Sequence, residues 1–350
     1  MVIAVTIGDR RVGSGSPCFV IAEAGVNHNG SVESACRLAE IAREAGADAV
    51  KFQTFKAAKL VTLDAPKAEY QRQTTSTGES QFEMLRALEL SEAAHREILE
   101  HCRRSGILFL SSPFDEESAD LLGTLGVPAF KIPSGEITNL TFLSHVARKG
   151  KPIILSTGMA DLAEVEQAVA TIRQAGNPNI ILLQCVTNYP AAPEDVNLRA
   201  MRTMAEACHL PVGYSDHTVG NEVAFAAVAL GACVVEKHFT LSRELPGPDH
   251  KASIEPDELA QLVRGIRAVE SAFGTGRKEP AVSEAATAAV ARRSLVAVST
   301  IPAGAVLTED VVAMRRPGTG LPPSMRGQVV GRRARVLIAE GTLISMEMLI

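Results

Sequence analysis

The sequence lacks the features that would place it on a nucleic acid, inside a membrane or among nucleotide-binding proteins. The net charge of its 350 residues is −5 and no long basic run is present, so we expect no nucleic-acid partner and no membrane partner. No stretch approaches the roughly 20 apolar residues of a membrane span. Neither the glycine pattern of dinucleotide-binding proteins nor that of a P-loop occurs, which leaves any phosphate to be bound by side chains.

Cysteine pairs with the spacing of a redox or metal motif are also missing. The six cysteines are scattered, and three of them lie in apolar, strand-like runs, which predicts buried, reduced thiols in a cytoplasmic protein. The apolar run at residues 1–7 is too short for a signal peptide. The hydrophobic content of 46% is that of a folded protein, and the length allows one large domain and a small one.

An alternation of strand-like and helical patterns fills most of the chain. Strand-like apolar runs lie at residues 18–25, 49–55, 108–114, 129–134, 152–158, 180–189, 211–217 and 233–240. Helical patterns, with apolar residues three and four apart, lie between most of them, for example at residues 32–45, 164–175 and 221–230. Eight such units predict a (β/α)₈ TIM barrel over residues 1–273, with a hairpin at 1–17. A doubly wound open sheet is the alternative, although it usually has fewer strands.

Two further segments stand apart from this alternation. The long connection at residues 56–92 follows the second strand and is expected to be a lid or a specificity loop. After a linker at 274–291, residues 292–350 predict a small, mainly β domain, with short strand-like runs at 294–298, 329–331 and 335–338 separated by turns.

Polar residues close nearly all of the strand-like runs in the predicted barrel. Because chemistry in such barrels lies at the carboxyl ends of the strands, this pattern predicts a polar active site. His217 and His238 end two consecutive strands and indicate a metal site, although a lone histidine is more often structural. Lys51 and Lys131 lie at equivalent levels and are suited to neutralising a phosphate or carboxylate, with serine hydroxyls around it.

Two other polar groupings have simpler interpretations. Ser215-Asp216-His217 is not a hydrolase triad, because adjacent residues of a strand face opposite ways and no nucleophile elbow precedes them. The stretch at residues 27–30, which contains His28, is interpreted as a turn between a strand and a helix, with Ser31 as the N-cap of that helix.

Several strings in the sequence resemble a known family, the bacterial nonulosonic (sialic) acid synthases. The strings lie at residues 21–30 (IAEAGVNHNG), 50–54 (VKFQT), 131–136 (KIPSGE), 155–159 (LSTGM), 214–218 (YSDHT), 236–240 (EKHFT), 247–253 (GPDHKAS) and 316–318 (RPG). Members of this family condense phosphoenolpyruvate with an N-acetylated mannose-type sugar. The resemblance covers essentially the whole chain, and residues 292–350 resemble the type III antifreeze-like (SAF) domain of these enzymes.

The resemblance also implies roles for individual residues. His217 and His238 correspond to ligands of a divalent metal ion, Mn²⁺ by the family pattern, and Glu23 corresponds to the acid/base carboxylate. The implied contacts of phosphoenolpyruvate are Lys51, Lys131, Ser134, Ser156 and Ser215, and Thr187 takes the place of a phosphate contact. Ser112 is implied to bind substrate. The implied contacts of the acceptor sugar are Gln53, Glu136, Tyr189, Asp249 and Arg316. Arg316 is implied to come from the partner subunit of a homodimer. Two positions depart from the family pattern, since Thr187 replaces an asparagine and Ser112 a threonine.

The acceptor sugar decides the product. N-acetylmannosamine would give N-acetylneuraminate, which is the main expectation, with loss of phosphate through cleavage of the C–O bond of phosphoenolpyruvate. A 2,4-diacetamido-2,4,6-trideoxymannose would give N,N′-diacetyllegionaminate. A carbohydrate-binding barrel without catalysis is a weaker alternative, because Glu23 and both histidines are intact.

Overall fold

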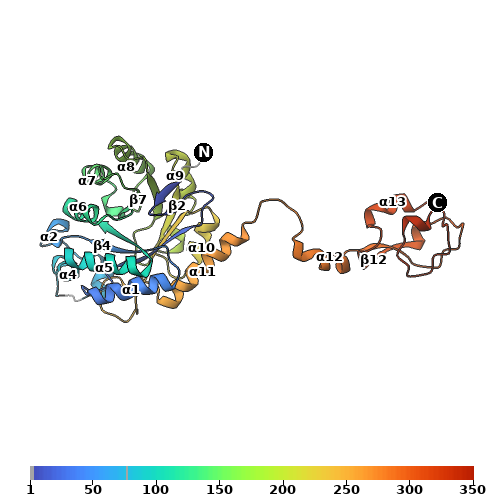
Figure 1. Ribbon diagram of the computed structural model, residues 1–350, viewed down its shortest axis with the longest axis horizontal. Helices are drawn as coiled ribbons and strands as arrows, with labels where there is room; N and C mark the ends of the chain where they lie inside the picture. The colour runs from blue at the N-terminus through green and yellow to red at the C-terminus, as the bar shows by residue number, and fades with distance from the viewer. Residues whose placement is uncertain (1–3, 76–77) are drawn as a thin grey trace. The chain divides into compact units, whose positions relative to one another are not determined.

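The computed structural model describes residues 4–75 and 78–350 (Figure 1). The chain forms two compact units, Met1–Phe273 and Gly274–Ile350, which are described separately below. In the described residues no helix is long and apolar enough to cross a membrane.

The first unit is a closed barrel of parallel strands. Within the described residues, the strands are β3 (Phe19–Gly25), β4 (Ala49–Thr54), β5 (Leu108–Pro113), β6 (Phe130–Ile132), β7 (Ile153–Ser156), β8 (Ile180–Cys185), β9 (Val212–Asp216) and β10 (Val234–His238). They form one sheet in the order β5-β4-β3-β10-β9-β8-β7-β6, and β5 also contacts β6, which closes it. This confirms the TIM barrel and excludes an open sheet.

Helices surround the barrel. They are α1 (Val32–Glu44), α5 (Glu92–Ser105), α6 (Glu116–Leu125), α7 (Leu140–Ala147), α8 (Leu162–Gln174), α9 (Ala200–Cys208), α10 (Glu222–Ala229) and α11 (Pro256–Ala272). Several begin at a residue whose side chain accepts a hydrogen bond from the first helical turn, as Ser31 does from the Ser34 backbone N–H. The sequence prediction of this cap is therefore confirmed.

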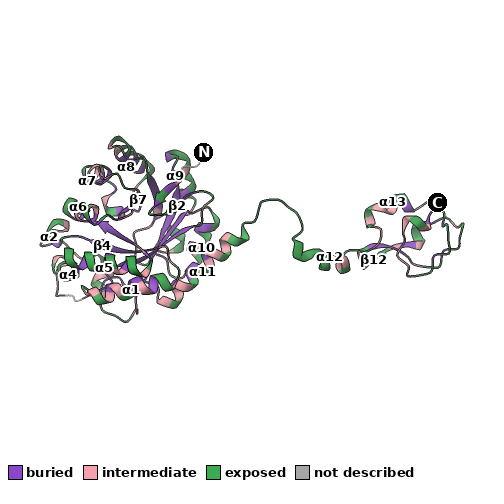
Figure 2. Cartoon of the chain, in the orientation of Figure 1, coloured by how far each residue is buried: buried purple, intermediate pink, exposed green. Residues whose placement is uncertain are grey.

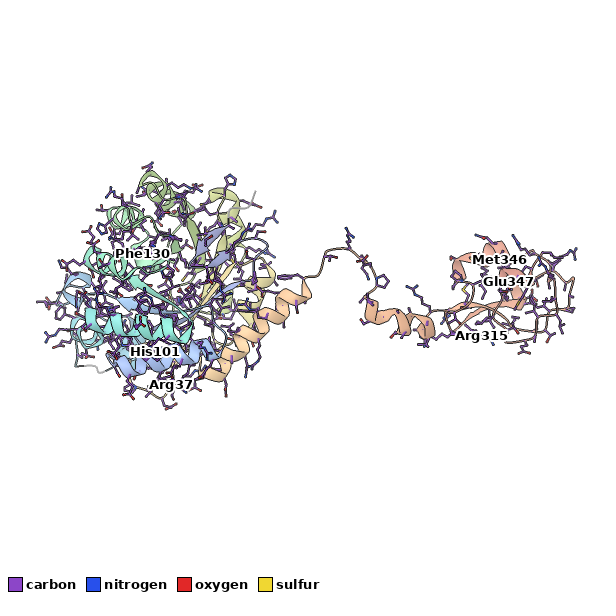
Figure 3. All side chains as sticks on the ribbon, in the orientation of Figure 1. Arg37, His101, Phe130, Arg315, Met346 and Glu347 are labelled. Atoms are coloured by element: carbon purple, nitrogen blue, oxygen red, sulfur yellow. The ribbon has the colours of Figure 1, made fainter. Side chains whose placement is uncertain are left out.

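Side chains alternate between two apolar layers along each strand. In β3, Val20 and Ala22 belong to the layer between strands and helices, whereas Phe19 and Ile21 belong to the layer inside the barrel. The outer layer also contains Phe130, which is labelled in Figure 3. Figure 2 shows barrel strands in the purple of buried residues and outer parts of the helices in the green of exposed residues.

An N-terminal hairpin closes one end of the barrel interior. Its strands β1 (Val5–Ile7) and β2 (Arg10–Val12) pair antiparallel, and its apolar side chains join the inner layer. The hairpin expected at residues 1–17 is present, although residues 1–3 lie outside the described part of the chain. β3 begins in contact with this layer, so the hairpin lies at the amino ends of the barrel strands. The opposite end, where the strands have their carboxyl ends, is not covered by the hairpin and is where we expect a site.

The connection between β4 and α5 contains short helices as well as irregular segments. It contains α2 (Ala57–Leu60), α3 (Glu69–Thr74) and α4 (Gln81–Leu88). Residues 76 and 77 of this connection lie outside the described residues. The helices α2 and α4 contact each other, so this connection is a small packed substructure.

The second unit contains a small antiparallel β domain. A turn of 3₁₀ helix (Val282–Glu284) and α12 (Ala285–Ala291) occupy the segment expected to be a linker. Strands β11 (Ser294–Ala297) and β12 (Val312–Arg315) pair around a core of Leu295, Ile301, Leu307 and Ile344.

Two strand predictions in this unit were wrong. Val329 ends helix α13 (Arg326–Val329), and Gly331 follows with a φ of +92°, which suits a turn rather than a strand. Residues 335–338 contribute an isolated bridge between Ile338 and Ile301 instead of a strand. Short apolar runs do not distinguish a strand from the last turn of a buried helix.

Candidate active site

The inward face of each barrel strand changes from apolar to polar towards its carboxyl end. In β3 the inward sequence is Phe19, Ile21 and then Glu23, and in β10 it is Val234, Glu236 and then His238. These polar ends line a cavity of about 400 Å³. Its lining contains most of the site residues predicted from the sequence: Glu23, Lys51, Gln53, Ser112, Lys131, Ser134, Ser156, Thr187, Tyr189, Ser215, His217, His238 and Asp249.

Two carboxylates and two ammonium groups form a buried cluster at the floor of the cavity. The Lys51 Nζ lies 2.7 Å from Glu23 Oε2 and donates to the Ser112 hydroxyl at 2.9 Å. The Lys131 Nζ lies 3.1 Å from Glu236 Oε1, and Lys51 lies 3.8 Å from the other oxygen of Glu236. All four side chains are at most 4% exposed, so each charge is balanced within the cluster rather than by water.

The pKa values of the two carboxylates in this cluster are shifted in opposite directions. Burial alone would raise the pKa of Glu236, but the ammonium groups of Lys131 and Lys51 outweigh burial and lower the pKa to about 2. Glu23 has one close ammonium group, that of Lys51, and burial dominates there and raises the pKa of Glu23 to about 7. Of the two carboxylates, Glu23 is therefore the one that can exchange a proton near neutral pH.

Glu236 was missed as a site residue in the sequence predictions. It lies two residues before His238 and on the same face of β10. This alternation is visible in the sequence and could have identified Glu236 as a site residue. Its oxygens accept from Lys131 and from the Ser215 hydroxyl at 3.1 Å. Glu236 therefore holds both a lysine and a serine of the site in place.

The two predicted metal ligands lie together beside this cluster. The ring centroids of His217 and His238 are 5.5 Å apart. His217 donates from Nδ1 to the Val186 carbonyl oxygen at 2.6 Å, which leaves the lone pair on Nε2. The Nδ1 of His238 is buried and has no hydrogen-bond partner among residues 4–75 and 78–350. Burial and the neighbouring His217 lower the pKa of His238 well below its usual value, so its imidazole is neutral.

This pair suits a divalent cation, because imidazoles are common metal ligands. In the described residues, no group of three or more His, Cys, Asp and Glu side chains is arranged to hold a metal ion. His217 and His238 thus bring two imidazole rings together here.

Hydroxyl groups face the cavity from the strands on the other side of the lysines. Ser134 accepts a hydrogen bond from the Gly158 backbone N–H at 3.0 Å. The hydroxyls of Ser156 and Thr187 are buried and lack a hydrogen-bond partner in the part of the chain that the structure describes. A Cβ atom on Gly158 would come within 2.2 Å of the Thr187 hydroxyl, so glycine keeps this corner open. Buried hydroxyls without partners are typical of a site that binds a polar ligand.

Aromatic rings cover the histidines from the side of the β4–α5 connection. The ring of Tyr189 lies 4.1 Å from that of His217, and Tyr70 lies 5.1 Å from Tyr189, between ring centroids. Asp249 lines the same region, and burial raises its pKa to about 6. This wall combines apolar ring faces with groups that can hydrogen-bond a sugar.

A second buried network lies behind the histidines, outside the cavity. The Lys237 Nζ donates to Asp216 at 2.6 Å and to the Thr218 carbonyl at 2.8 Å. Asp216 also accepts from the Tyr214 hydroxyl at 3.1 Å and the Thr218 backbone N–H at 2.9 Å. Asp216 thus ties the ends of β9 and β10 together and does not form a triad with its neighbours.

Of the predicted site residues in the described first unit, Glu136 does not line the cavity, and Arg316 belongs to the second unit. Glu136 lies at the end of a 3₁₀ turn (Ser134–Glu136), where its carboxylate accepts from the Asn139 side chain at 2.8 Å. Arg316 is exposed and follows β12 in the second unit. His28 lies in a turn, where its Nδ1 accepts from the Gly30 backbone N–H at 2.9 Å.

The barrel and its polar mouth define a TIM-barrel enzyme, and comparisons with known proteins identify the family. Residues 38–278 match the NeuB family, and residues 292–350 match the SAF domain. The N,N′-diacetyllegionaminic acid synthase of Legionella pneumophila is 49% identical over 344 residues, which cover 97% of this chain and 97% of that protein. The enzyme of the same name from Campylobacter jejuni is 49% identical over 328 residues, 93% of this chain and 98% of that protein.

A solved structure agrees with this assignment. The N-acetylneuraminic acid synthetase of Leptospira borgpetersenii is 35% identical with a TM-score of 0.72, and the match covers 82% of this chain and 95% of that one. The chain belongs to the NeuB family, which confirms the resemblance seen in the sequence. It is a phosphoenolpyruvate-dependent nonulosonic acid synthase with a C-terminal SAF domain, and its family uses divalent metal ions.

Proposed function

We propose that this protein condenses phosphoenolpyruvate with 2,4-diacetamido-2,4,6-trideoxymannose and water to give N,N′-diacetyllegionaminate and phosphate. The observation that carries the reaction is the buried cluster of Glu23, Lys51, Lys131 and Glu236 beside the two histidines. The acceptor rests on the identity of 49% to two proteins named as legionaminic acid synthases, against 35% to one named as an N-acetylneuraminic acid synthetase. This favours legionaminate over the neuraminate expected from the sequence.

Phosphoenolpyruvate would bind over the lysines and the hydroxyl groups. Its phosphate and carboxylate require several donors, and Lys51, Lys131 and the serines supply them from fixed strand ends. The buried hydroxyls of Ser156 and Thr187 support this placement, because both lack a partner in the described chain and can donate to phosphate oxygens. Ser112 already accepts from Lys51 and so orients that ammonium group.

The reaction forms one C–C bond and breaks one C–O bond. C3 of phosphoenolpyruvate attacks the aldehyde carbon of the open-chain sugar, and water adds to C2 before phosphate leaves with the oxygen of the enol ester. Of the two protons of water, one ends on the new hydroxyl group and the other on phosphate. Glu23 has a pKa of about 7, which suits it to accept the first proton and to return it.

A divalent ion held by His217 and His238 would supply Lewis-acid activation of the aldehyde oxygen. The chain's own contribution is to orient these imidazoles and to keep that of His238 neutral. The Val186 carbonyl fixes the tautomer of His217, and the network of Asp216 and Lys237 fixes the strand ends behind both rings. Tyr189 stacks on His217 and screens it from solvent.

The same proposal includes a homodimer in which Arg316 of the partner subunit contacts the acetamido group of the acceptor. Arg316 is exposed at the end of β12, and its planar guanidinium can donate two hydrogen bonds to a carbonyl oxygen. The short SAF domain is too small to form a sugar pocket by itself.

The experiment that tests the proposed function is turnover with phosphoenolpyruvate and each acceptor in turn, in ¹⁸O-labelled water. We expect phosphate release to equal product formation, with no label in phosphate, and a higher kcat/KM for the diacetamido sugar than for N-acetylmannosamine. Glu23→Gln is the control, because it keeps the shape of the side chain and should stop phosphate release. A higher kcat/KM for N-acetylmannosamine would overturn the acceptor assignment, and labelled phosphate would overturn the C–O cleavage.

A further inference from the structure

One side of the active-site cavity is apolar, in contrast to its charged floor. The side chains on this side are Val26, Leu60, Val61, Met84, Leu85 and Leu88. Most of them also form a small hydrophobic cluster with Phe55 that is separate from the two layers of the barrel. These residues are called the apolar wall below.

The apolar wall is provided mainly by the connection between β4 and α5. Leu60 comes from α2, and Met84, Leu85 and Leu88 come from α4. Met84 and Leu88 are buried, whereas Leu60 and Leu85 are half-buried and border both the cavity and the cluster. The wall therefore consists of packed side chains at a fixed place in the first unit.

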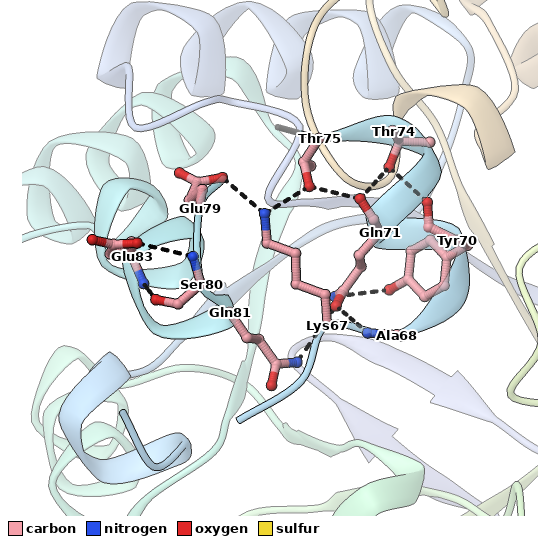
Figure 4. Close-up of polar contacts among 10 residues, drawn as sticks. All are labelled: Lys67, Ala68, Tyr70, Gln71, Thr74, Thr75, Glu79, Ser80, Gln81 and Glu83. Carbon is pink, nitrogen blue, oxygen red and sulfur yellow. Dashed lines mark hydrogen bonds and ion pairs between the residues drawn. The ribbon is translucent and has the colours of Figure 1, made fainter. Parts of the chain in front are cut away.

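A polar network holds these helices in position (Figure 4). The Lys67 Nζ, whose side chain is 5% exposed, pairs with Glu79 at 3.0 Å and donates to Thr75 at 3.0 Å. At the start of α4, the Ser80 side chain accepts a hydrogen bond from the Glu83 backbone N–H, and the Glu83 side chain accepts one from the Ser80 backbone N–H. The Thr74 hydroxyl donates to the Pro248 carbonyl at 3.1 Å, which joins the connection to the segment that carries Asp249.

The floor and the wall impose an orientation on the acceptor. Its aldehyde must lie near Glu23 and the two histidines, because the new C–C bond forms there. The remaining carbons of the open chain then extend away from the floor. Towards the β4–α5 connection they meet hydrocarbon side chains, with the amides of Gln71 and Gln81 nearby.

We propose that the apolar wall selects the acceptor by its far end, receiving the methyl group of a 6-deoxy sugar and disfavouring a 6-hydroxyl group. This inference rests on the proposed function, since it assumes a nonulosonic acid acceptor at this site. A hydroxyl group packed against the leucine and methionine side chains loses its water and gains no hydrogen-bond partner from them, whereas a methyl group is buried favourably. Discrimination of this kind in an apolar pocket is worth roughly 10- to 100-fold in kcat/KM.

The experiment compares sugars that differ only at C6. One pair is N-acetylmannosamine and 2-acetamido-2,6-dideoxymannose, and the other pair consists of the 2,4-diacetamido sugars with and without the 6-hydroxyl group. In the wild-type protein we expect the 6-deoxy member of each pair to have the higher kcat/KM, by roughly 10- to 100-fold. The readout is initial phosphate release at saturating phosphoenolpyruvate.

Leu60→Gln and Leu85→Gln change the wall from two different helices, so a folding defect in one does not prevent the test. Each should lower the 6-deoxy preference by roughly 10-fold and leave the KM for phosphoenolpyruvate unchanged. Leu63→Gln is the matched control, because Leu63 lies on the same connection, is 70% exposed and does not line the cavity in the described structure. It should leave the preference as it is in the wild type.

The inference is overturned if the wild type shows no preference for the 6-deoxy member of either pair. It is also overturned if both wall variants reduce the use of all four sugars equally, since that result indicates a purely structural wall. The proposed acceptor is judged separately, by comparison of the sugars with and without the 4-acetamido group. A C6 preference can therefore hold even where the assignment to legionaminate fails.

Discussion

Replacement of the buried His28 by asparagine should remove part of the acid sensitivity of folding. His28 is 0% exposed, its Nδ1 accepts from the Gly30 backbone N–H at 2.9 Å, and its Nε2 has no partner among the described residues. An asparagine side chain can accept the same hydrogen bond two residues on, so the turn should persist. The variant loses the ring that lies 6.1 Å from Phe52 and should be less stable by roughly 1–3 kcal/mol at neutral pH.

The pH dependence follows from the pKa of His28. Burial, with smaller effects of His95 and His250, lowers this pKa from 6.5 to about 4. A lowered histidine pKa means that the unfolded chain binds the proton more tightly, so stability falls as the pH drops from about 6.5 to 4. At 1.36 kcal/mol per pKa unit the whole loss is about 3 kcal/mol, and about 2 kcal/mol of it is reached by pH 5.

The assay is urea unfolding of wild type and His28→Asn at several pH values between about 7.5 and 4. Far-UV circular dichroism is the suitable probe, because the chain contains no tryptophan. The stability advantage of the wild type should shrink as the pH falls, by the amounts above. His209→Asn is the control, since His209 is exposed with a φ of +54°, which asparagine adopts readily. A wild-type advantage that is constant across this range would refute the argument that burial holds His28 neutral.

Three further outcomes are expected from the site. Exhaustive chelation should abolish turnover and Mn²⁺ should restore it, and full activity of metal-free protein would remove the metal from the proposal. Lys51→Met and Lys131→Met should each weaken the use of phosphoenolpyruvate by about 2–5 kcal/mol in kcat/KM, whereas a rise in the acceptor KM alone would mean that the two substrate positions are reversed. Arg316→Ala subunits mixed with Glu23→Gln subunits should regain activity, because a mixed dimer has one barrel with both groups. No recovery after subunit exchange, checked by mass, would mean that the arginine acts within its own chain.

Much of the barrel follows from local patterns in the sequence. The alternation Phe19, Ile21, Glu23 places three side chains inside the barrel whatever the neighbouring strands are, because the pleat of a strand fixes the direction of each residue. The same reasoning places His217 and His238 at one end. The strand ends were predicted within a few residues for the same reason.

Local patterns failed where the backbone departs from a strand at its end. Glu136 follows Ser134 by two residues and would share its face in a continued strand. The chain instead enters a 3₁₀ turn after β6, which directs the Glu136 carboxylate to Asn139. In the second unit, β12 was not predicted because it is only four residues long and its apolar residues are followed by an arginine, so it shows no apolar period.

The sequence by itself determined which chemical groups are present and on which face of each strand they lie, since both depend on near neighbours in the chain. The tertiary structure decided which groups meet. Lys51 contacts both Glu23 and Glu236, which are more than 200 residues apart. Glu236 also has the ammonium group of Lys131 beside it, and this difference separates the pKa values of the two carboxylates. The apolar wall likewise exists only because α2 and α4 fold back over the mouth of the barrel, a packing arrangement that no local period specifies.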